Sequence, residues 1–361
     1  MKIVITGGGT GGHLSVASAF IDEFKNRGFV CVFIGSKGGQ DRAFFENDNR
    51  LEKKIFFDTQ GVVNQKGFKK IQSLFAHLKA LKEANKILKL EKPDFVLSVG
   101  GYSAAPCAFG TVFNKIPLII HEQNAKIGRL NQLLKNRARI FFSSYEESSP
   151  CKFYPIKQDF FKNARARSEV KNILIMGGSQ GARALNNFAL SLACDLKEKK
   201  IRLFHQCGKN DFENLQKEYS ALNLKLKIFD SMEEKDLADL EFDVGLFAFS
   251  KIMPKVMNLC DFAISRSGAS SLWELCANGL PALFIPYPYA ASNHQYFNAK
   301  FLEDKNIGFL CDEKVLYDKV LWDILECFKG SEMLSKMSKE VQKECSKSAV
   351  SEMVDIILKR I

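Results

Sequence analysis

Two glycine-rich segments have the composition of anion-binding loops. The first, Gly7–His13, reads GGGTGGH, and the second, Gly177–Ala182, reads GGSQGA; each follows a short apolar run and precedes a helix-like stretch. Backbone N–H groups without neighbouring side chains can approach an anion, and a helix N-terminus adds about half a positive charge. A third glycine-containing segment, Gly100–Gly101, follows the apolar run Phe95–Val99. Such glycines can also serve only in tight turns, but three segments together favour diphosphate binding.

The spacing of Gly7–Gly12 also matches the GxGxxG pattern of dinucleotide-binding proteins. Those proteins place an acidic residue after the second strand, where it binds the ribose hydroxyls. Here the expected second strand runs into Gly35-Ser36-Lys37, which holds no carboxylate, and no GxxxxGK[ST] motif occurs. We therefore expect neither a nicotinamide or flavin cofactor nor a P-loop.

Polar side chains gather at other strand ends of the first half. His121-Glu122-Gln123-Asn124 follows the apolar run Leu118–Ile120, and four polar residues in succession form a poor core. The chain has only 5 His, and His13 lies at another strand end of the same half. A lone loop histidine more often packs or caps, but two at one predicted edge favour function. His13 is our first candidate for a general base, since a helix N-terminus disfavours its protonation. Glu122 is the second.

The second half has its own polar segment, Ser265–Glu274, with the sequence SRSGASSLWE. It predicts a strand end, a tight turn and a helix. Glu274 could accept both hydroxyls of a ribose while the turn amides meet a phosphate or base. Capping, or pairing with Arg266, is the alternative for this carboxylate. Further on, Asn293–Ala299 supplies amides suited to sugar hydroxyls.

No DxD triplet and no His, Cys or carboxylate cluster with metal spacing occurs. We therefore expect no metal and no cofactor. Charge on a leaving diphosphate would then be balanced by loop amides, a helix dipole and cationic side chains, for which Arg183, Arg266 and Lys157 are the candidates.

Short β-branched or aromatic runs alternate with longer helical stretches, which predicts an α/β protein with parallel sheets. The expected strands are Lys2–Thr6, Val30–Ile34, Phe95–Val99, Leu118–Ile120, Arg139–Ser143, Asn172–Met176, Arg202–Gln206, Leu224–Phe229, Phe262–Ser265 and Ala282–Ile285. Because each half opens with a strand that runs into glycines, we expect one architecture used twice, with both glycine loops facing a cleft. A single sheet of about ten strands would be at the upper limit for an open sheet.

Bulk composition fits this picture. The chain has 361 residues, 46% of them hydrophobic and 26% charged, which is typical of a soluble two-domain protein. No apolar run reaches the roughly 20 residues that span a bilayer, and no signal-peptide pattern is present, so we expect a cytoplasmic protein. The 10 cysteines form no CxxC pair, which favours reduced, mostly buried thiols. A net charge of +11 favours an anionic partner.

Six motifs in order resemble the MurG family of N-acetylglucosaminyltransferases. They are GGTGGH at Gly8–His13, GGYSAAP at Gly100–Pro106, HEQN at His121–Asn124, GGSQGARALN at Gly177–Asn186, RSGA…E at Arg266–Glu274 and HQxxNA at His294–Ala299. The resemblance implies a GT-B fold of two Rossmann-like domains: residues 1–155 for the acceptor and residues 156–345 for the donor. A final helix over about 346–361 would return to the first domain.

The resemblance also implies a reaction. The donor would be UDP-N-acetylglucosamine, the acceptor undecaprenyl-diphospho-N-acetylmuramoyl-pentapeptide, and the transfer inverting and metal-independent. Carried over to this sequence, the donor-binding residues are Asn124, Ser179, Asn186, Ser250, Ala269, Ser270, Glu274 and Gln295, and Thr10, Gly11 and Gly12 lie where donor and acceptor phosphates meet. Of the cationic candidates, Lys157 and Arg266 are assigned to the donor with them. The acceptor-binding residues are Gly9, Gly101, Tyr102, Ser103 and His121.

The sequence departs from the family pattern at three places. Tyr154-Pro155-Ile156-Lys157 stands where the family usually has Asn-Pro-Val-Arg, so Lys157 keeps the charge but lacks the bidentate fork of arginine. Ser292 replaces a common acidic residue that would accept from a sugar hydroxyl. Ile127 replaces a frequent proline, which implies only a local change of turn.

Residues 67–82 place apolar side chains at helical spacing with lysines between them. Core packing is the default explanation for such a stripe. In a basic protein with a lipid-linked acceptor, the same segment could bind an anionic membrane. We expect a peripheral protein on the cytoplasmic face of the inner membrane.

Two other functions fit parts of the sequence. Another metal-independent GT-B glycosyltransferase with a lipid acceptor is the nearest alternative. A basic nucleic-acid-binding protein is the other, but the sequence has no RNP-like or helix-turn-helix signature. We therefore expect no nucleic-acid partner.

Overall fold

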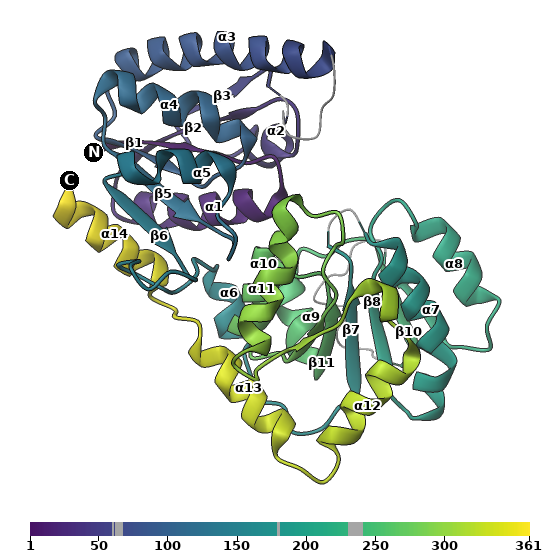
Figure 1. Ribbon diagram of the computed structural model, residues 1–361. Coiled ribbons are helices and arrows are strands. Elements are labelled where there is room, and N and C mark those ends of the chain that lie inside the picture. Colours follow the sequence, from purple (N-terminus) through teal and green to yellow (C-terminus); the bar gives the residue numbers. More distant parts are fainter. Residues whose placement is uncertain (60, 62–67, 179–180, 230–240) are drawn as a thin grey trace. The chain divides into compact units, whose positions relative to one another are not determined.

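A computed structural model describes residues 1–59, 61, 68–178, 181–229 and 241–361, with the backbone alone at residues 68–72 and 74 (Figure 1). The chain divides into two compact units. Unit 1 comprises Met1–Lys157 and Lys347–Ile361, and unit 2 comprises Gln158–Ser346. The sequence-based boundaries at 155/156 and 345/346 lie within two residues of these.

Unit 1 is built on a parallel sheet with the strand order β3-β2-β1-β4-β5-β6 in its described part. The strands are β1 (Lys2–Thr6), β2 (Val30–Ser36), β3 (Lys53–Phe57), β4 (Phe95–Ser98), β5 (Leu118–Glu122) and β6 (Ile140–Ser143). The helices are α1 (Gly11–Asn26), α2 (Asp41–Phe45), α3 (Phe68–Glu91), α4 (Ala105–Asn114), α5 (Arg129–Leu134) and α14 (Ala349–Arg360), with 3₁₀ turns at Tyr102–Ala104 and Lys135–Arg137.

Helices bury both faces of the central strands, which is why these strands read as continuous apolar runs. On one face Val4 and Val96 join a core with Ala84 and Leu88 of α3. On the other, Phe24 of α1 meets Phe95 of β4 edge to face, with ring centroids 5.8 Å apart. The sheet is thus fixed from both sides, and its strand ends are fixed with it.

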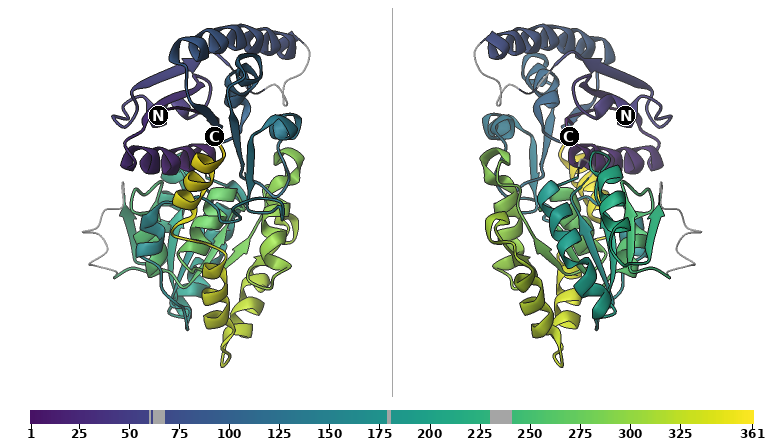
Figure 2. Two further views of the ribbon diagram at one scale, coloured as in Figure 1. Left: turned by 90° about the vertical axis from the view of Figure 1, so that its left-hand side faces the viewer. Right: turned by 90° about the vertical axis from the view of Figure 1, so that its right-hand side faces the viewer.

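The final helix, α14, packs on α1 within unit 1 (Figure 2). Arg27, at the end of α1, donates to Asp355 at 2.5 Å and to the Ser351 hydroxyl at 2.8 Å. Met353 and Val354 are fully buried. The carboxyl-terminal segment therefore completes the unit that contains the amino terminus.

Unit 2 has a second parallel sheet, with the order β13-β12-β11-β7-β8-β10-β9 in its described part. The strands are β7 (Asn172–Met176), β8 (Arg202–Gln206), β9 (Leu226–Phe229), β10 (Val244–Phe247), β11 (Phe262–Ser265), β12 (Ala282–Phe284) and β13 (Phe309–Leu310). The helices are α6 (Gln158–Lys162), α7 (Arg183–Glu198), α8 (Phe212–Ser220), α9 (Met253–Leu259), α10 (Ala269–Ala277), α11 (His294–Glu303), α12 (Asp318–Phe328) and α13 (Met333–Lys343), with 3₁₀ turns at Ala291–Asn293 and Glu313–Val315.

All ten expected strands are present, with ends displaced by at most two residues. The sequence-based assignment missed β3, β10 and β13. Each lacks a clear signal: β3 begins with two lysines, β10 has a glycine at its second position, and β13 has two residues.

Two glycine loops of unit 1 interlock at the carboxyl ends of the neighbouring strands β1 and β4. The Gly8 N–H donates to the Gly100 carbonyl oxygen at 3.1 Å. A Cβ atom at Gly101 would lie 2.1 Å from the Gly8 carbonyl oxygen, and Gly101 has a φ of +82°. These glycines therefore allow the two backbones to touch, in addition to any role at a ligand.

Gly101→Ala should destabilise unit 1 by about 3 kcal/mol, since it combines a left-handed residue with a backbone clash. Gly28→Ala is a matched control, because Gly28 has a φ of +77° but open space where its Cβ would lie. Its loss should be about 1 kcal/mol. Urea unfolding followed by circular dichroism measures both, and equal losses would contradict the interlock.

Candidate functional site

His13 lies at the amino terminus of α1, directly after the first glycine loop. Thr10 is the N-cap residue, and its Oγ1 lies 2.8 Å from His13 Nδ1. A Cβ at Gly100 would lie 3.5 Å from His13 Nε2, so the half-buried imidazole lies over the second loop. Gly11 and Gly12 form the first turn of the helix. The structure thus brings Thr10–His13 and Gly100 together.

Asp41 was missed by the sequence-based analysis. Its fully buried carboxylate accepts from Gly9 N–H through Oδ1 and from Ser36 N–H through Oδ2, the latter at 2.9 Å. The amide of Gly9, which we had assigned to the acceptor, is thus bound to an anion supplied by the chain. The available signal was an acid shortly after the second strand, although it does not lie where a ribose-binding acid is expected.

Glu122 lies within β5 and is buried, whereas we expected it in a loop after the strand. Its Oε1 accepts from Asn124 N–H at 3.0 Å. Its Oε2 accepts from Gly128 N–H at 2.9 Å and from Asn131 Nδ2 at 2.8 Å. This carboxylate therefore organises the loop after β5, including the half-buried Asn124.

His121 also lies within β5 and is fully buried. Its ring contacts Phe20 and Tyr154, with centroids 6.2 and 5.5 Å away. Burial lowers its pKa to about 3, and the nearby His13 lowers it further to a lesser degree. His121 is thus a neutral ring inside unit 1, where its effect on an acceptor would be indirect.

The other predicted acceptor residues lie around the second glycine loop. Tyr102 packs against Gly9, since a Cβ at Gly9 would lie 2.7 Å from the Tyr102 ring. Burial raises the pKa of the Tyr102 hydroxyl. Ser103 is fully buried in the same 3₁₀ turn.

In unit 2, α10 begins at the carboxyl end of β11. Gly268 is its N-cap, and no described atom lies within 4 Å of the position of a Cβ at that residue. Ala269 and Ser270 form the first turn, and the half-buried Glu274 follows on the second. Because helix N-termini bind anions, this end can accommodate a phosphate while Glu274 lies one turn further on.

Asn186 belongs to a buried network and does not line a surface. Its Nδ2 donates to Asp211 at 2.8 Å, and its Oδ1 lies 3.1 Å from His205 Nε2. His205 Nδ1 lies 3.0 Å from the Tyr219 hydroxyl. Burial lowers the pKa of His205 to about 3. Asn186 therefore anchors the start of α7 from inside.

Arg266 directly follows β11, and Gln295 lies in the first turn of α11. The Arg266 guanidinium pairs with Glu313, donates to the Ile285 and Pro286 carbonyl oxygens at 3.1 Å, and lies over the Tyr287 ring. Gln295 Oε1 accepts from Tyr287 N–H at 2.9 Å. These two predicted donor residues therefore hold one turn, Ile285–Tyr287.

The remaining predicted residues are more scattered. Ser250 is buried, and its hydroxyl accepts from Ile252 N–H at 3.1 Å. Arg183 is the exposed first residue of α7, and Lys157 is the half-buried last residue of the first segment of unit 1. Ser179 lies outside the described residues.

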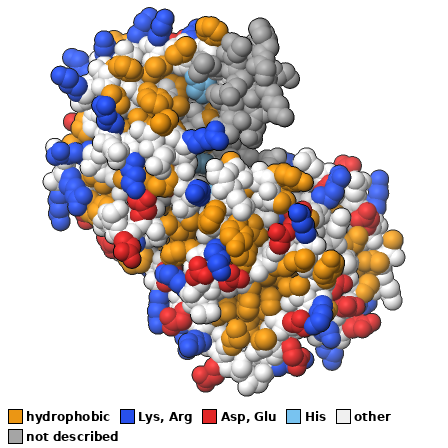
Figure 3. Space-filling view, viewed as in Figure 1, with side chains coloured by type: hydrophobic (Ala, Val, Ile, Leu, Met, Phe, Trp, Pro, Cys, Tyr) orange, Lys and Arg blue, Asp and Glu red, His pale blue; other side chains and the backbone are white. Residues whose placement is uncertain are grey.

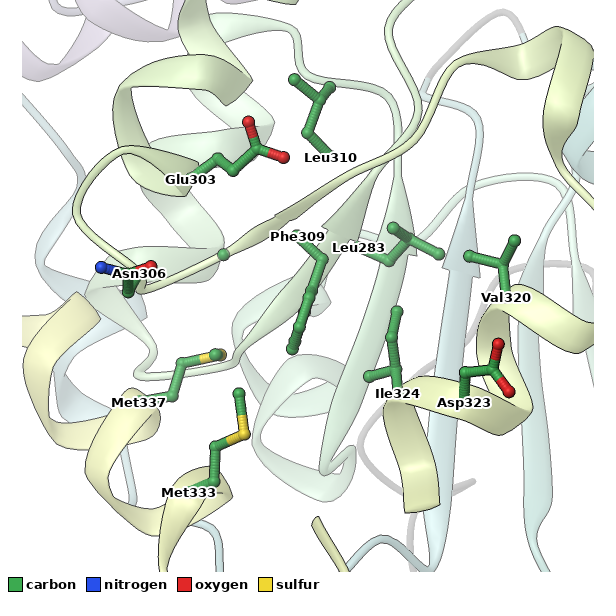
Figure 4. Close-up of a pocket in the computed structure, with 11 residues that line it drawn as sticks. Leu283, Glu303, Asn306, Phe309, Leu310, Val320, Asp323, Ile324, Met333 and Met337 are labelled. Carbon is green, nitrogen blue, oxygen red and sulfur yellow. The ribbon is translucent and has the colours of Figure 1, made fainter. Parts of the chain in front are cut away.

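Unit 2 also has a cavity of about 390 Å³ that none of the predicted site residues line (Figure 4). Its walls are mainly apolar side chains of β12, β13, α12 and α13, and Figure 4 shows Met333 and Met337 directed toward Phe309. Its two carboxylates, Glu303 and Asp323, pair with Lys300 and Lys319. Over the described residues, no group of three or more His, Cys, Asp or Glu is arranged to hold a metal ion.

Two α/β units, each with a parallel sheet and polar residues near its strand ends, are the architecture of GT-B glycosyltransferases. Residues 3–143 match the glycosyltransferase family 28 N-terminal domain, and residues 172–353 match the family 28 C-terminal domain. The chain belongs to glycosyltransferase family 28.

Individual relatives are similar over most of the chain. A Wolinella succinogenes protein is 46% identical over 99% of this chain and 100% of its own length, and a Campylobacter jejuni protein is 51% identical over 84% and 83%. Both are named UDP-N-acetylglucosamine–N-acetylmuramyl-(pentapeptide) pyrophosphoryl-undecaprenol N-acetylglucosamine transferase. The crystal structure of Acinetobacter baumannii MurG matches with a TM-score of 0.76 at 27% identity, over 99% of both chains. The resemblance inferred from the six motifs is confirmed.

Proposed function

We propose that the chain transfers N-acetylglucosamine from UDP-N-acetylglucosamine to the 4-hydroxyl of the muramoyl sugar of undecaprenyl-diphospho-muramoyl-pentapeptide. The observation that carries this proposal is the 46% identity, over 99% of the chain, to a relative named for that transfer. The six sequence motifs support it, and three of them, at Gly8–His13, Gly100–Pro106 and Arg266–Glu274, begin directly or within a few residues after the strands β1, β4 and β11, where open α/β sheets bind their ligands.

Unit 2 is proposed to bind the donor. Glu274 accepts from the ribose hydroxyls, and the amides at the amino terminus of α10 stabilise the diphosphate. These amides and the helix dipole balance the charge of the leaving UDP without a bound metal. Activity is accordingly expected to persist in EDTA.

His13 is proposed as the general base in a single displacement with inversion. The acceptor oxygen attacks the anomeric carbon, the bond from that carbon to the UDP oxygen breaks, and the hydroxyl proton passes to His13 Nε2. In this proposal Nδ1 carries the ring proton and donates it to Thr10 Oγ1, which lies 2.8 Å away, and the lone pair is on Nε2. Glu122 is the weaker candidate, because both of its oxygens already accept hydrogen bonds from its own loop.

UDP release from UDP-N-acetylglucosamine should require the lipid-linked muramoyl acceptor. His13→Ala should lower kcat by about 10²- to 10⁴-fold, the usual contribution of a positioned base, and leave the KM for the donor nearly unchanged. An unchanged kcat with a raised donor KM would make His13 a binding residue. UDP release that responds only to a different lipid-linked sugar would identify another GT-B transferase.

The outer face of α3 is proposed to bind an anionic membrane surface. In the described part of this helix, Ala80, Ala84 and Leu88 face the core, while Phe75 and Leu78 are exposed among lysines. Figure 3 shows exposed apolar side chains among Lys and Arg on unit 1. None of the described helices is both long and apolar enough to cross a bilayer, so the proposed contact is peripheral.

Phe75→Glu should weaken binding to phosphatidylglycerol vesicles about tenfold, since it replaces an apolar contact by a charge of the same sign as the lipid. Tyr317→Glu, at a residue of unit 2 with equal exposure, is the control and should have little effect. Co-sedimentation at low and high salt measures this binding. Wild-type protein that ignores anionic lipid would rule out the membrane contact.

A further inference from the structure

Glu313 is a partly buried carboxylate whose partner is a predicted donor residue. It begins a 3₁₀ turn after β13 and pairs with Arg266, whose side chain is only 11% exposed. Sequence reasoning gave Glu313 no role and assigned Arg266 to the donor diphosphate. The ion pair between these two residues therefore needs an explanation other than diphosphate binding by Arg266.

The guanidinium of Arg266 is already surrounded. Nη2 donates to Glu313, Nη1 donates to the Ile285 and Pro286 carbonyl oxygens, and Cζ lies 5.6 Å from the centroid of the Tyr287 ring. A diphosphate would have to compete with a carboxylate and two carbonyl groups for these N–H donors. This geometry suits an arginine that holds a turn better than one that binds a ligand.

The turn held by Arg266 is also hydrogen-bonded to Gln295. Tyr287 N–H donates to Gln295 Oε1 at 2.9 Å, so the Nε2 group of Gln295 is the end that can donate to a ligand. The Ser267 hydroxyl donates to the Gln295 carbonyl oxygen at 2.8 Å. Ser267 in turn precedes Gly268, the N-cap of α10. One chain of contacts therefore joins Glu313 to both Gln295 and the proposed diphosphate-binding helix.

We propose that Glu313 is a positioning residue for the donor sugar, acting through Arg266 on the Ile285–Tyr287 turn and thereby on Gln295. The proposal rests on the donor half of the proposed function. Because Glu313 fixes Arg266 in place, the sugar meets a preorganised amide, and the diphosphate is left to the α10 amides. Arg266 and Glu313 then affect recognition of the sugar but not of UDP.

The test compares binding of UDP-N-acetylglucosamine and UDP to the intact chain by calorimetry. Glu313→Ala should raise the Kd for UDP-N-acetylglucosamine about tenfold and leave the Kd for UDP within about twofold. Glu326→Ala is the control, since it removes the same charge from an exposed pair with Lys329 in unit 2. It should change neither Kd.

A double-mutant cycle tests whether Glu313 acts through Arg266. In an Arg266→Ala background, Glu313→Ala should have no further effect on the Kd for UDP-N-acetylglucosamine. Glu313→Gln, which keeps a hydrogen-bond acceptor, should recover part of the loss. A Glu313→Ala protein with a lowered thermal midpoint but unchanged ratio of the two Kd values would overturn the proposal.

Two other results are decisive. Weaker UDP binding by the Arg266→Ala protein, with uridine binding unchanged, would show that Arg266 binds the diphosphate, and this would overturn the proposal. Wild-type protein that binds neither UDP nor UDP-N-acetylglucosamine would overturn the proposed function itself, and the positioning role would fall with it.

Discussion

The contact between the two glycine loops of unit 1 is the constraint on which its site depends. Gly8 donates to the Gly100 carbonyl oxygen, and Gly101 leaves no space for a side chain beside Gly8. Asp41 completes the arrangement by accepting from Gly9 N–H. Because α1 begins directly after this loop, the same contacts fix the position of His13.

The backbone near the proposed site of unit 2 is held in place by different contacts. Its proposed anion-binding group is the start of α10, and side chains rather than a second glycine loop hold the neighbouring turn. Arg266, Glu313 and Gln295 form that support. Glycines that admit close backbone contact thus organise one unit, and a charged pair with an amide organises the other.

Much of the fold could be predicted from the sequence, because parallel strands buried on both faces give continuous apolar runs. Motif order was sufficient for the family as well. The roles of buried polar residues could not be predicted in this way. Glu122, Asn186 and His121 stand in binding motifs, yet their side chains are turned inward. Asp41 and Glu313 were missed because Gly9 and Arg266, which they bind, are distant from them in sequence.

The central claim is that the contacts between the glycine loops of unit 1 position His13, the proposed general base. Asp41→Asn tests this claim most directly. The two carboxylate oxygens of Asp41 accept from Gly9 N–H and Ser36 N–H, and an asparagine, which has one amide oxygen, would lose one of these two hydrogen bonds. The measurement is kcat together with the Kd for UDP-N-acetylglucosamine. The account predicts a kcat lowered by about 10- to 100-fold with an unchanged donor Kd. A raised donor Kd with an unchanged kcat would contradict it.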